Sequence, residues 1–252
     1  MTIRVVVAGA TGWTGSALVE AISKADDLEL AAGVARRGEG MMPTLEAALG
    51  APSDVVVDYT HPSVVKAHAL LALSKGRHVV VGTSGLTAAD YSEIDAAARK
   101  AGRGVIAAGN FSITATLLTR FAVEAARYVP DVEVIDYASA KKPDVPSGTT
   151  QELAERIAAV RGKGSSVPVA DVLGPKAARG AAIGEGTSVQ LHSLRLPSYI
   201  IAVEAIFGAP DERLTIRHDA GSSAAPYVAG TLLAVRKVVE TVGLTRGLDS
   251  LI

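Results

Sequence analysis

The chain has 252 residues, of which 48% are hydrophobic, and a formal net charge of −1; these values are typical of a compact globular protein with one large or two modest domains. The near-neutral charge and the lack of any block of like charges argue against nucleic-acid binding and against attraction to a membrane surface. The absence of cysteine excludes disulfides, thiolate metal sites and cysteine nucleophiles.

Two further absences narrow the class of protein. No two histidines or carboxylates fall at ligand spacing with supporting context, so no metal site is expected. The N-terminus lacks the charged-then-apolar layout of a signal peptide, and no apolar run reaches the ~18 to 20 residues of a membrane span. We therefore expect a cytoplasmic protein.

A glycine-rich turn follows the first predicted strand. Residues 3–8 form a short, β-branched run typical of a strand buried on both faces, and a helical pattern begins after residue 15. Strand, turn and helix in this order are the context of a dinucleotide-binding turn, in which the first glycine makes the turn, the second admits the pyrophosphate and the third packs helix on strand. The alternative is a turn without a ligand. The predicted cofactor residues here are Gly9, Thr11, Gly12, Trp13, Thr14 and Gly15.

The second predicted strand, residues 28–34, leads into a basic turn. A strand in this position normally presents an acid to the ribose 2′-hydroxyl of NAD, but Arg36 and Arg37 follow here. Two arginines suit the 2′-phosphate of NADP; the alternative is a solvated basic turn. The sequence therefore favours NADPH, with NADH as the alternative.

Three more strands are predicted at residues 54–60, 78–81 and 104–108, and helical patterns separate them. This alternation predicts an α/β fold, a Rossmann-type doubly wound parallel sheet. Ligands of such sheets bind beyond the carboxyl ends of the strands, where polar or glycine-rich loops fall in this chain. The loops add the predicted cofactor residues Tyr59, Thr60, Gly82, Thr83, Ser84, Gly109, Asn110 and Phe111.

The pattern changes after a predicted helix at residues 113–128. Strand-like segments at 187–196, 200–208 and 213–218 follow one another without helices between them, which predicts a mixed or antiparallel sheet in a smaller α+β domain. A last helix, 227–241, is expected to pack on the first domain. We expect one domain at 1–110 and 219–252, and the other at 111–218.

The segment from Lys141 to Thr150 has the features of an anion site. Two prolines keep its first half extended, and its second half resembles the start of a helix, with N-cap residue types and a glycine that lets a ligand approach. Backbone N–H groups at a helix start, hydroxyl side chains and two lysines together suit a carboxylate or a phosphate. The alternative is an ordinary capped helix with lysines in solvent.

These motifs together resemble the dihydrodipicolinate reductase family, across nearly the whole chain. The matching segments are the glycine turn GATGWTG, then DYTHP, GTSG, GNFS and KPDVPSGT. The resemblance implies an enzyme that reduces a small carboxylated imine or cyclic enamine with NAD(P)H. It also implies that the second domain binds substrate and builds a homotetramer through its sheet. The residues implied to hold the substrate are Ser139, Lys142, Ser147, Gly148 and Thr149.

One departure from the family pattern concerns the proton donor. The family carries a His-His pair a few residues before the motif lysine, and this chain has Ala138 and Ser139 there. The remaining candidates are Lys142 first, then Tyr137, Ser139 through a water, or His61. A positioned acid is typically worth ~10² to 10⁴-fold in rate. Its loss is tolerable if the substrate arrives as a protonated iminium, so a changed substrate is one hypothesis.

Two other functions remain open from the sequence. The chain could be an imine reductase or an amine or amino-acid dehydrogenase with a different substrate. It could also be a non-catalytic NADP-binding homologue, although the retained lysine and the P-S-G-T turn argue against a protein with no substrate.

Overall fold

A computed structural model describes residues 2–252, and the chain divides into two compact units, Met1–Ile113 with Ala224–Ile252 (unit 1) and Thr114–Ser223 (unit 2). The α/β class and the mixed second sheet predicted from the sequence are confirmed. Among the described residues no helix is long and apolar enough to cross a membrane. Nor do three or more metal-ligating side chains gather anywhere in residues 2–252.

Unit 1 contains a six-stranded sheet whose strands are all parallel, in the order β11-β5-β4-β3-β1-β2. The first five strands along the chain are those predicted. The sixth, β11, was not predicted, because four residues after the last helix carry no periodic signal. The strands are β1 (Ile3–Ala8), β2 (Leu28–Val34), β3 (Val55–Asp58), β4 (His78–Val81), β5 (Gly104–Ala107) and β11 (Gly243–Arg246).

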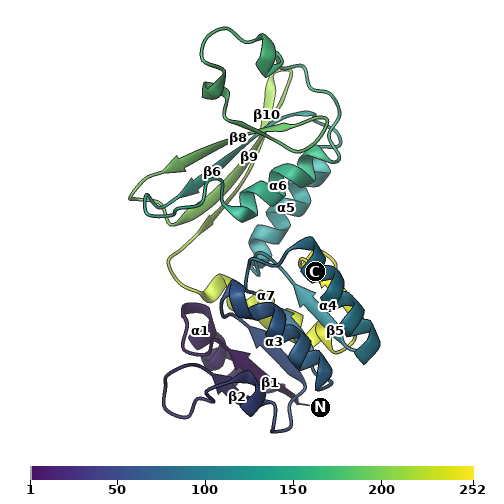
Figure 1. The fold of residues 1–252 in the computed structure, drawn as a ribbon. Helices are drawn as coiled ribbons and strands as arrows, with labels where there is room; N and C mark the ends of the chain where they lie inside the picture. Colours follow the sequence, from purple (N-terminus) through teal and green to yellow (C-terminus); the bar gives the residue numbers. More distant parts are fainter. Residues whose placement is uncertain (1) are drawn as a thin grey trace. The chain divides into compact units, whose positions relative to one another are not determined.

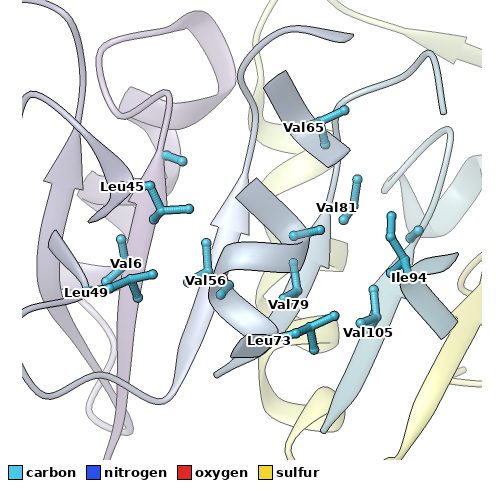
Figure 2. Packing of buried hydrophobic residues seen from close by; sticks show 14 of the residues in the cluster. Val6, Leu45, Leu49, Val56, Val65, Leu73, Val79, Val81, Ile94 and Val105 are labelled. Carbon is cyan, nitrogen blue, oxygen red and sulfur yellow. The ribbon is translucent and has the colours of Figure 1, made fainter. Parts of the chain in front are cut away.

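Helices cover both faces of this sheet (Figure 1). On one face, the valines of the central strands pack against α2 (Leu45–Ala48), α3 (Pro62–Ser74) and α4 (Ala88–Ala101). Figure 2 shows this cluster of almost entirely aliphatic side chains. On the other face lie α1 (Trp13–Ser23) and α7 (Ala225–Val238). Strands buried on both sides explain the continuous valine runs, and the arrangement brings the carboxyl-end loops to one edge of the sheet.

Unit 2 contains a five-stranded mixed sheet in the order β10-β9-β6-β8-β7, in which only β6 and β8 pair in parallel. Two helices, α5 (Ile113–Ala125) and α6 (Gly148–Ala158), pack on one face over a core that includes Phe207 and Leu153. The strands are β6 (Asp131–Ala138), β7 (Ala181–Ile183), β8 (Val189–Arg195), β9 (Ile201–Ala209) and β10 (Glu212–Ala220).

The segment 165–186 differs from its predicted loop. It contains two short 3-10 helices, η1 (Val169–Asp171) and η2 (Lys176–Arg179), and the edge strand β7. These elements are only three or four residues long, too short to produce a pattern in a glycine-, proline- and alanine-rich segment.

Candidate active site

The glycine turn between β1 and α1 is tightly packed. Gly9 has a φ of 85°, and a Cβ there would lie 2.2 Å from the carbonyl oxygen of Tyr59. A Cβ at Gly15 would lie 2.0 Å from the carbonyl oxygen of Gly9. Gly12 is the exposed N-cap of α1, and its N–H donates to that same carbonyl over 2.9 Å. The turn thus presents backbone and the N-terminus of an 11-residue helix, which suits a phosphate.

A groove of about 1070 Å³ runs along the carboxyl ends of β1, β2 and β3, at the upper end of the size of small-molecule and cofactor sites. Arg36 and Arg37 line it, both are exposed, and neither forms an ion pair with any residue that the structure describes. The residues present therefore fit a dinucleotide: glycines where a Cβ would clash or intrude, a helix start and two unpaired cations. The other residues lining the groove include Thr11, Pro43, Thr60, His61 and His68.

Asp58 joins the loops that follow β3 and β4. It is 1% exposed, and its Oδ1 accepts hydrogen bonds from the Thr60 N–H (3.1 Å) and from the hydroxyls of Thr60 and Thr83 (both 2.7 Å). Its Oδ2 lies 2.7 Å from Nδ1 of His68. Burial raises the pKa of Asp58, but the bonds from His68, Thr83 and Thr60 outweigh it, so the net pKa is lowered. Sequence reasoning placed the threonines in the site but missed this carboxylate and His68.

Tyr59 covers the end of β4. A Cβ at Gly82 would lie 2.2 Å from Cζ of the tyrosine ring, so only glycine admits it. The Tyr59 hydroxyl lies 2.8 Å from that of Thr231, and its ring centroid is 6.1 Å from that of Phe111. Burial raises the pKa of Tyr59. Tyr59 and Phe111 are therefore packing elements of the loops, and the phenol is not placed to release a proton.

The remaining predicted cofactor residues differ in exposure. Trp13 is 59% exposed and meets Tyr227 edge-on at 5.7 Å. Ser84 and Gly109 are exposed at the ends of β4 and β5. Asn110 accepts a hydrogen bond from the Ser112 N–H over 2.8 Å, which shapes the last of the four loops.

In unit 2, the predicted substrate residues gather around the start of α6. Ser147 is its N-cap and is 1% exposed. The Ser147 hydroxyl lies near Asp136 and helps to lower its pKa, but it completes no hydrogen bond. Gly148 is exposed, and a Cβ there would meet nothing within 4 Å. Nζ of Lys142 lies 2.6 and 2.7 Å from the two carboxylate oxygens of Asp144, and this pairing lowers the pKa of Asp144.

A buried carboxylate lies behind this turn. Asp136, on β6, is fully buried, and its Oδ2 accepts the Ser147 N–H over 2.9 Å and a guanidinium nitrogen of Arg195 over 2.7 Å. Burial raises the pKa of Asp136, but these two donors outweigh it and the net pKa is lowered. The sequence held a signal for it: Asp136 continues the alternation of Val132 and Val134, which places a carboxylate on the core face.

The residues in place of the histidine pair offer no replacement imidazole. Ala138 is fully buried, and Ser139 accepts the Lys142 N–H at its carbonyl over 2.9 Å. Tyr137 lies on the opposite face of the sheet from Asp136. There its hydroxyl donates to Glu204 over 2.8 Å, and its ring contacts that of Tyr199 at a tilt of 50°. Burial and Glu204 raise the pKa of Tyr137. It is therefore a poor candidate for the proton donor.

Comparison with known proteins decides the family. The family model described as "Dihydrodipicolinate reductase, N-terminus" matches residues 3–111, and that described as "Dihydrodipicolinate reductase, C-terminus" matches residues 114–251. The chain belongs to the dihydrodipicolinate reductase family. As a member, it is an NAD(P)H-dependent oxidoreductase that acts on a small substrate, and the resemblance seen in its motifs is confirmed.

Individual relatives match over their whole length. The 4-hydroxy-tetrahydrodipicolinate reductase of Mycobacterium sp. (strain KMS) is 41% identical over 251 residues, which cover 99% of each chain. That of Nocardia farcinica is 43% identical over 255 residues, 99% of this chain and 98% of the relative. Among solved structures, the dipicolinate-bound dihydrodipicolinate reductase from Paenisporosarcina sp. TG-14 is 30% identical, with a TM-score of 0.88 and 100% of both chains covered.

Proposed function

We propose that the start of α6 and Lys142 bind a carboxylate of the substrate whose C=N bond, or conjugated C=C bond, is reduced. The observation that carries this proposal is the Ser147 hydroxyl, which is buried at a helix N-terminus and, although it lies near Asp136, completes no hydrogen bond with any residue that the structure describes. Leaving such a group unsatisfied costs free energy, which a bound carboxylate would recover. The positive end of the helix and the ammonium of Lys142 favour the same charge. The proposed substrate residues are Ser139, Lys142, Ser147, Gly148 and Thr149.

Lys142 is also the proposed catalytic residue. Its ammonium carries three donors, so its two hydrogen bonds to Asp144 leave one for a substrate carboxylate or for the substrate nitrogen. When bound, the cofactor supplies a hydride from its nicotinamide ring. The protein has to hold the acceptor carbon about 3 to 3.5 Å from the donor and to supply a proton to the substrate nitrogen of any imine that arrives neutral. Lys142 is the nearest cation to the proposed carboxylate turn along the chain that can serve the second task.

For the cofactor we propose a preference for NADPH. Arg36 and Arg37 line the groove at the end of β2 and have no acidic partner among residues 2–252. A 2′-phosphate would provide an anionic partner. The glycine turn would hold the pyrophosphate, and the loops at 82–84 and 109–111 would border the nicotinamide.

The loss of the histidine pair bears on the substrate. With Ala138 fully buried and the Ser139 carbonyl bonded to the Lys142 N–H, these two positions supply no imidazole to protonate an imine. We therefore propose that the physiological substrate differs from that of the other family members and reaches the enzyme already protonated, as an iminium. By family resemblance we further propose a cytoplasmic homotetramer, formed through the face of the unit 2 sheet that α5 and α6 do not cover.

Two matched lysine variants test the carboxylate proposal. NADPH oxidation would be followed with a panel of carboxylated imines, including freshly made 4-hydroxy-tetrahydrodipicolinate, and binding with dipicolinate, which the Paenisporosarcina enzyme binds. Lys142→Met should raise KM and weaken the binding of dipicolinate. Lys141→Met, at the exposed neighbouring lysine, should change neither KM nor this binding. Equal behaviour of the two variants would contradict the carboxylate site. Fast turnover of 4-hydroxy-tetrahydrodipicolinate would contradict the changed substrate.

A further inference from the structure

The proposed carboxylate site has two halves that are separated along the chain. One half is the ammonium of Lys142, and the other is the turn that begins at Ser147. The intervening segment, residues 143–146, is partly exposed and belongs to no helix or strand. Something else has to fix the distance between the two halves.

A single nitrogen of Arg195 contacts the supports of both. This Nη2 atom donates to Oδ2 of Asp136 over 2.7 Å, and also to the carbonyl oxygen of Asp144 over 2.7 Å. Asp136 in turn accepts the N–H of Ser147, and the carboxylate of Asp144 holds Lys142. The chain of contacts therefore runs from the helix start through Arg195 to the lysine.

The surroundings of Arg195 make this link rigid. Its side chain is 15% exposed and that of Asp136 is fully buried. The second guanidinium nitrogen, Nη1, donates to the carbonyl oxygen of Leu194 over 2.9 Å. Thr150 and Ser193 donate their hydroxyls to Asp136 over 3.1 and 3.2 Å. The carboxylate of Asp136 and both terminal nitrogens of Arg195 are thus held by hydrogen bonds, although Nε of Arg195 forms none with the residues that the structure describes. A buried ion pair held at this many positions is constrained in geometry.

We propose that Arg195 is a positioning residue, which sets Lys142 and the Ser147 turn at the spacing that a substrate carboxylate requires. The inference rests on the proposed carboxylate site and deepens it. Arg195 needs no contact with the substrate for this role. It acts through Asp136 on one side and through Asp144 on the other.

The guanidinium geometry is what the role requires, beyond its charge. A lysine at this position keeps one positive charge beside Asp136. Its ammonium is a compact point charge on a flexible stem, so it loses the planar fork that reaches Asp136, Asp144 and Leu194 together. Arg195→Lys therefore separates position from charge.

The test compares Arg195→Lys with Arg161→Lys. Arg161 also binds backbone carbonyls, those of Ser188 and Gly162, but lies just beyond the opposite end of α6. We expect Arg195→Lys to raise KM and the Kd of dipicolinate roughly tenfold, the size of one lost charge-assisted hydrogen bond. The Kd of NADPH should stay within about twofold of the wild type, whereas kcat should also fall because Lys142 is displaced. Arg161→Lys should leave all four values unchanged.

A coupling measurement distinguishes positioning from general structural support. If Arg195 acts in part through Lys142, the effect of Arg195→Lys on dipicolinate binding should shrink when Lys142 is already Met. If Arg195→Lys does not fold, as judged by circular dichroism, Asp136→Asn breaks the same pair and should likewise weaken the binding of dipicolinate while leaving the binding of NADPH unchanged.

Three results would overturn the inference. One is unchanged dipicolinate binding in Arg195→Lys, the second is an equal loss of NADPH affinity, and the third is full additivity with Lys142→Met. If one of these results is found but Lys142→Met still weakens the binding of dipicolinate, the proposed carboxylate site stands without a role for Arg195. If it does not, the proposed site fails as well.

Discussion

The glycine turn between β1 and α1 allows packing and ligand binding to be separated with two single-methyl changes. In Gly15→Ala the new Cβ would lie 2.0 Å from the Gly9 carbonyl oxygen and 2.8 Å from its carbonyl carbon. Both are backbone atoms that cannot rotate away. In Gly12→Ala the new Cβ would lie 3.1 Å from the same oxygen, which a small shift relieves. The φ of Gly12 is −73°, a value open to alanine.

The two variants should fail in different ways. Overpacking in Gly15→Ala should cost up to about 3 kcal/mol, which lowers the Tm by ~6–12 °C in a chain of this size. Gly12→Ala should lower the free energy of unfolding by about 1 kcal/mol or less. Its methyl group, however, projects where the pyrophosphate is expected, so its Kd for NADPH should rise at least about tenfold.

Calorimetric titration with NADPH and thermal unfolding would be run on the same preparations. The reasoning is refuted if Gly12→Ala binds NADPH as tightly as the wild type, since the turn would then hold no pyrophosphate. It is also refuted if Gly15→Ala unfolds at the wild-type temperature, since the close approach of Gly15 to Gly9 would then not matter.

Three further predictions follow from other parts of the molecule. Replacing Arg36 and Arg37 with Ala should weaken the binding of NADPH by roughly 10- to 100-fold and leave the binding of NADH unchanged, because only the 2′-phosphate needs a cation there. Equal losses of affinity for the two cofactors, measured by titration, would contradict the preference for NADPH. Gly148→Ala should keep or raise the Tm, because the new Cβ meets nothing within 4 Å and alanine favours helix, yet it should weaken the binding of dipicolinate. Gly208→Ala, whose Cβ is equally unobstructed but lies on β9, is the control and should leave that binding unchanged. The pKa values of Asp58 and Asp136 are lowered in the folded state. Their contribution to the free energy of unfolding is therefore present above the unfolded Asp pKa of about 3.9 and is lost as the pH falls through the folded values. Urea midpoints measured between about pH 6 and pH 3 should show this fall in stability, and Asp58→Asn should make it shallower.

The loops proposed to bind the nucleotide could be located from the sequence because their signals are local. Each loop directly follows a valine-rich strand, and a parallel sheet brings all carboxyl ends to one edge. Gly9 and Gly15 indicate, from the sequence alone, a turn in which two backbone segments pack closely. Tyr59 and Phe111 could be placed in these loops, but the packing of Tyr59 against Thr231, Gly82 and Phe111 could not be predicted.

What escaped prediction depends on residues distant in sequence. Asp136 and Arg195 are 59 positions apart and meet only because β6 and β8 pair in parallel. His68 reaches Asp58 from the second turn of α3.

The most direct test traces the hydrogen that the cofactor transfers to the substrate. NADPH carrying deuterium at the transferred position of the nicotinamide would be incubated with carboxylated imines and the enzyme, and the products analysed by mass spectrometry. The account predicts that deuterium appears on the reduced carbon of at least one carboxylated imine, and that Lys142→Met greatly reduces this transfer while Lys141→Met does not. No deuterium in any carboxylated product, or equal transfer by both lysine variants, would contradict it.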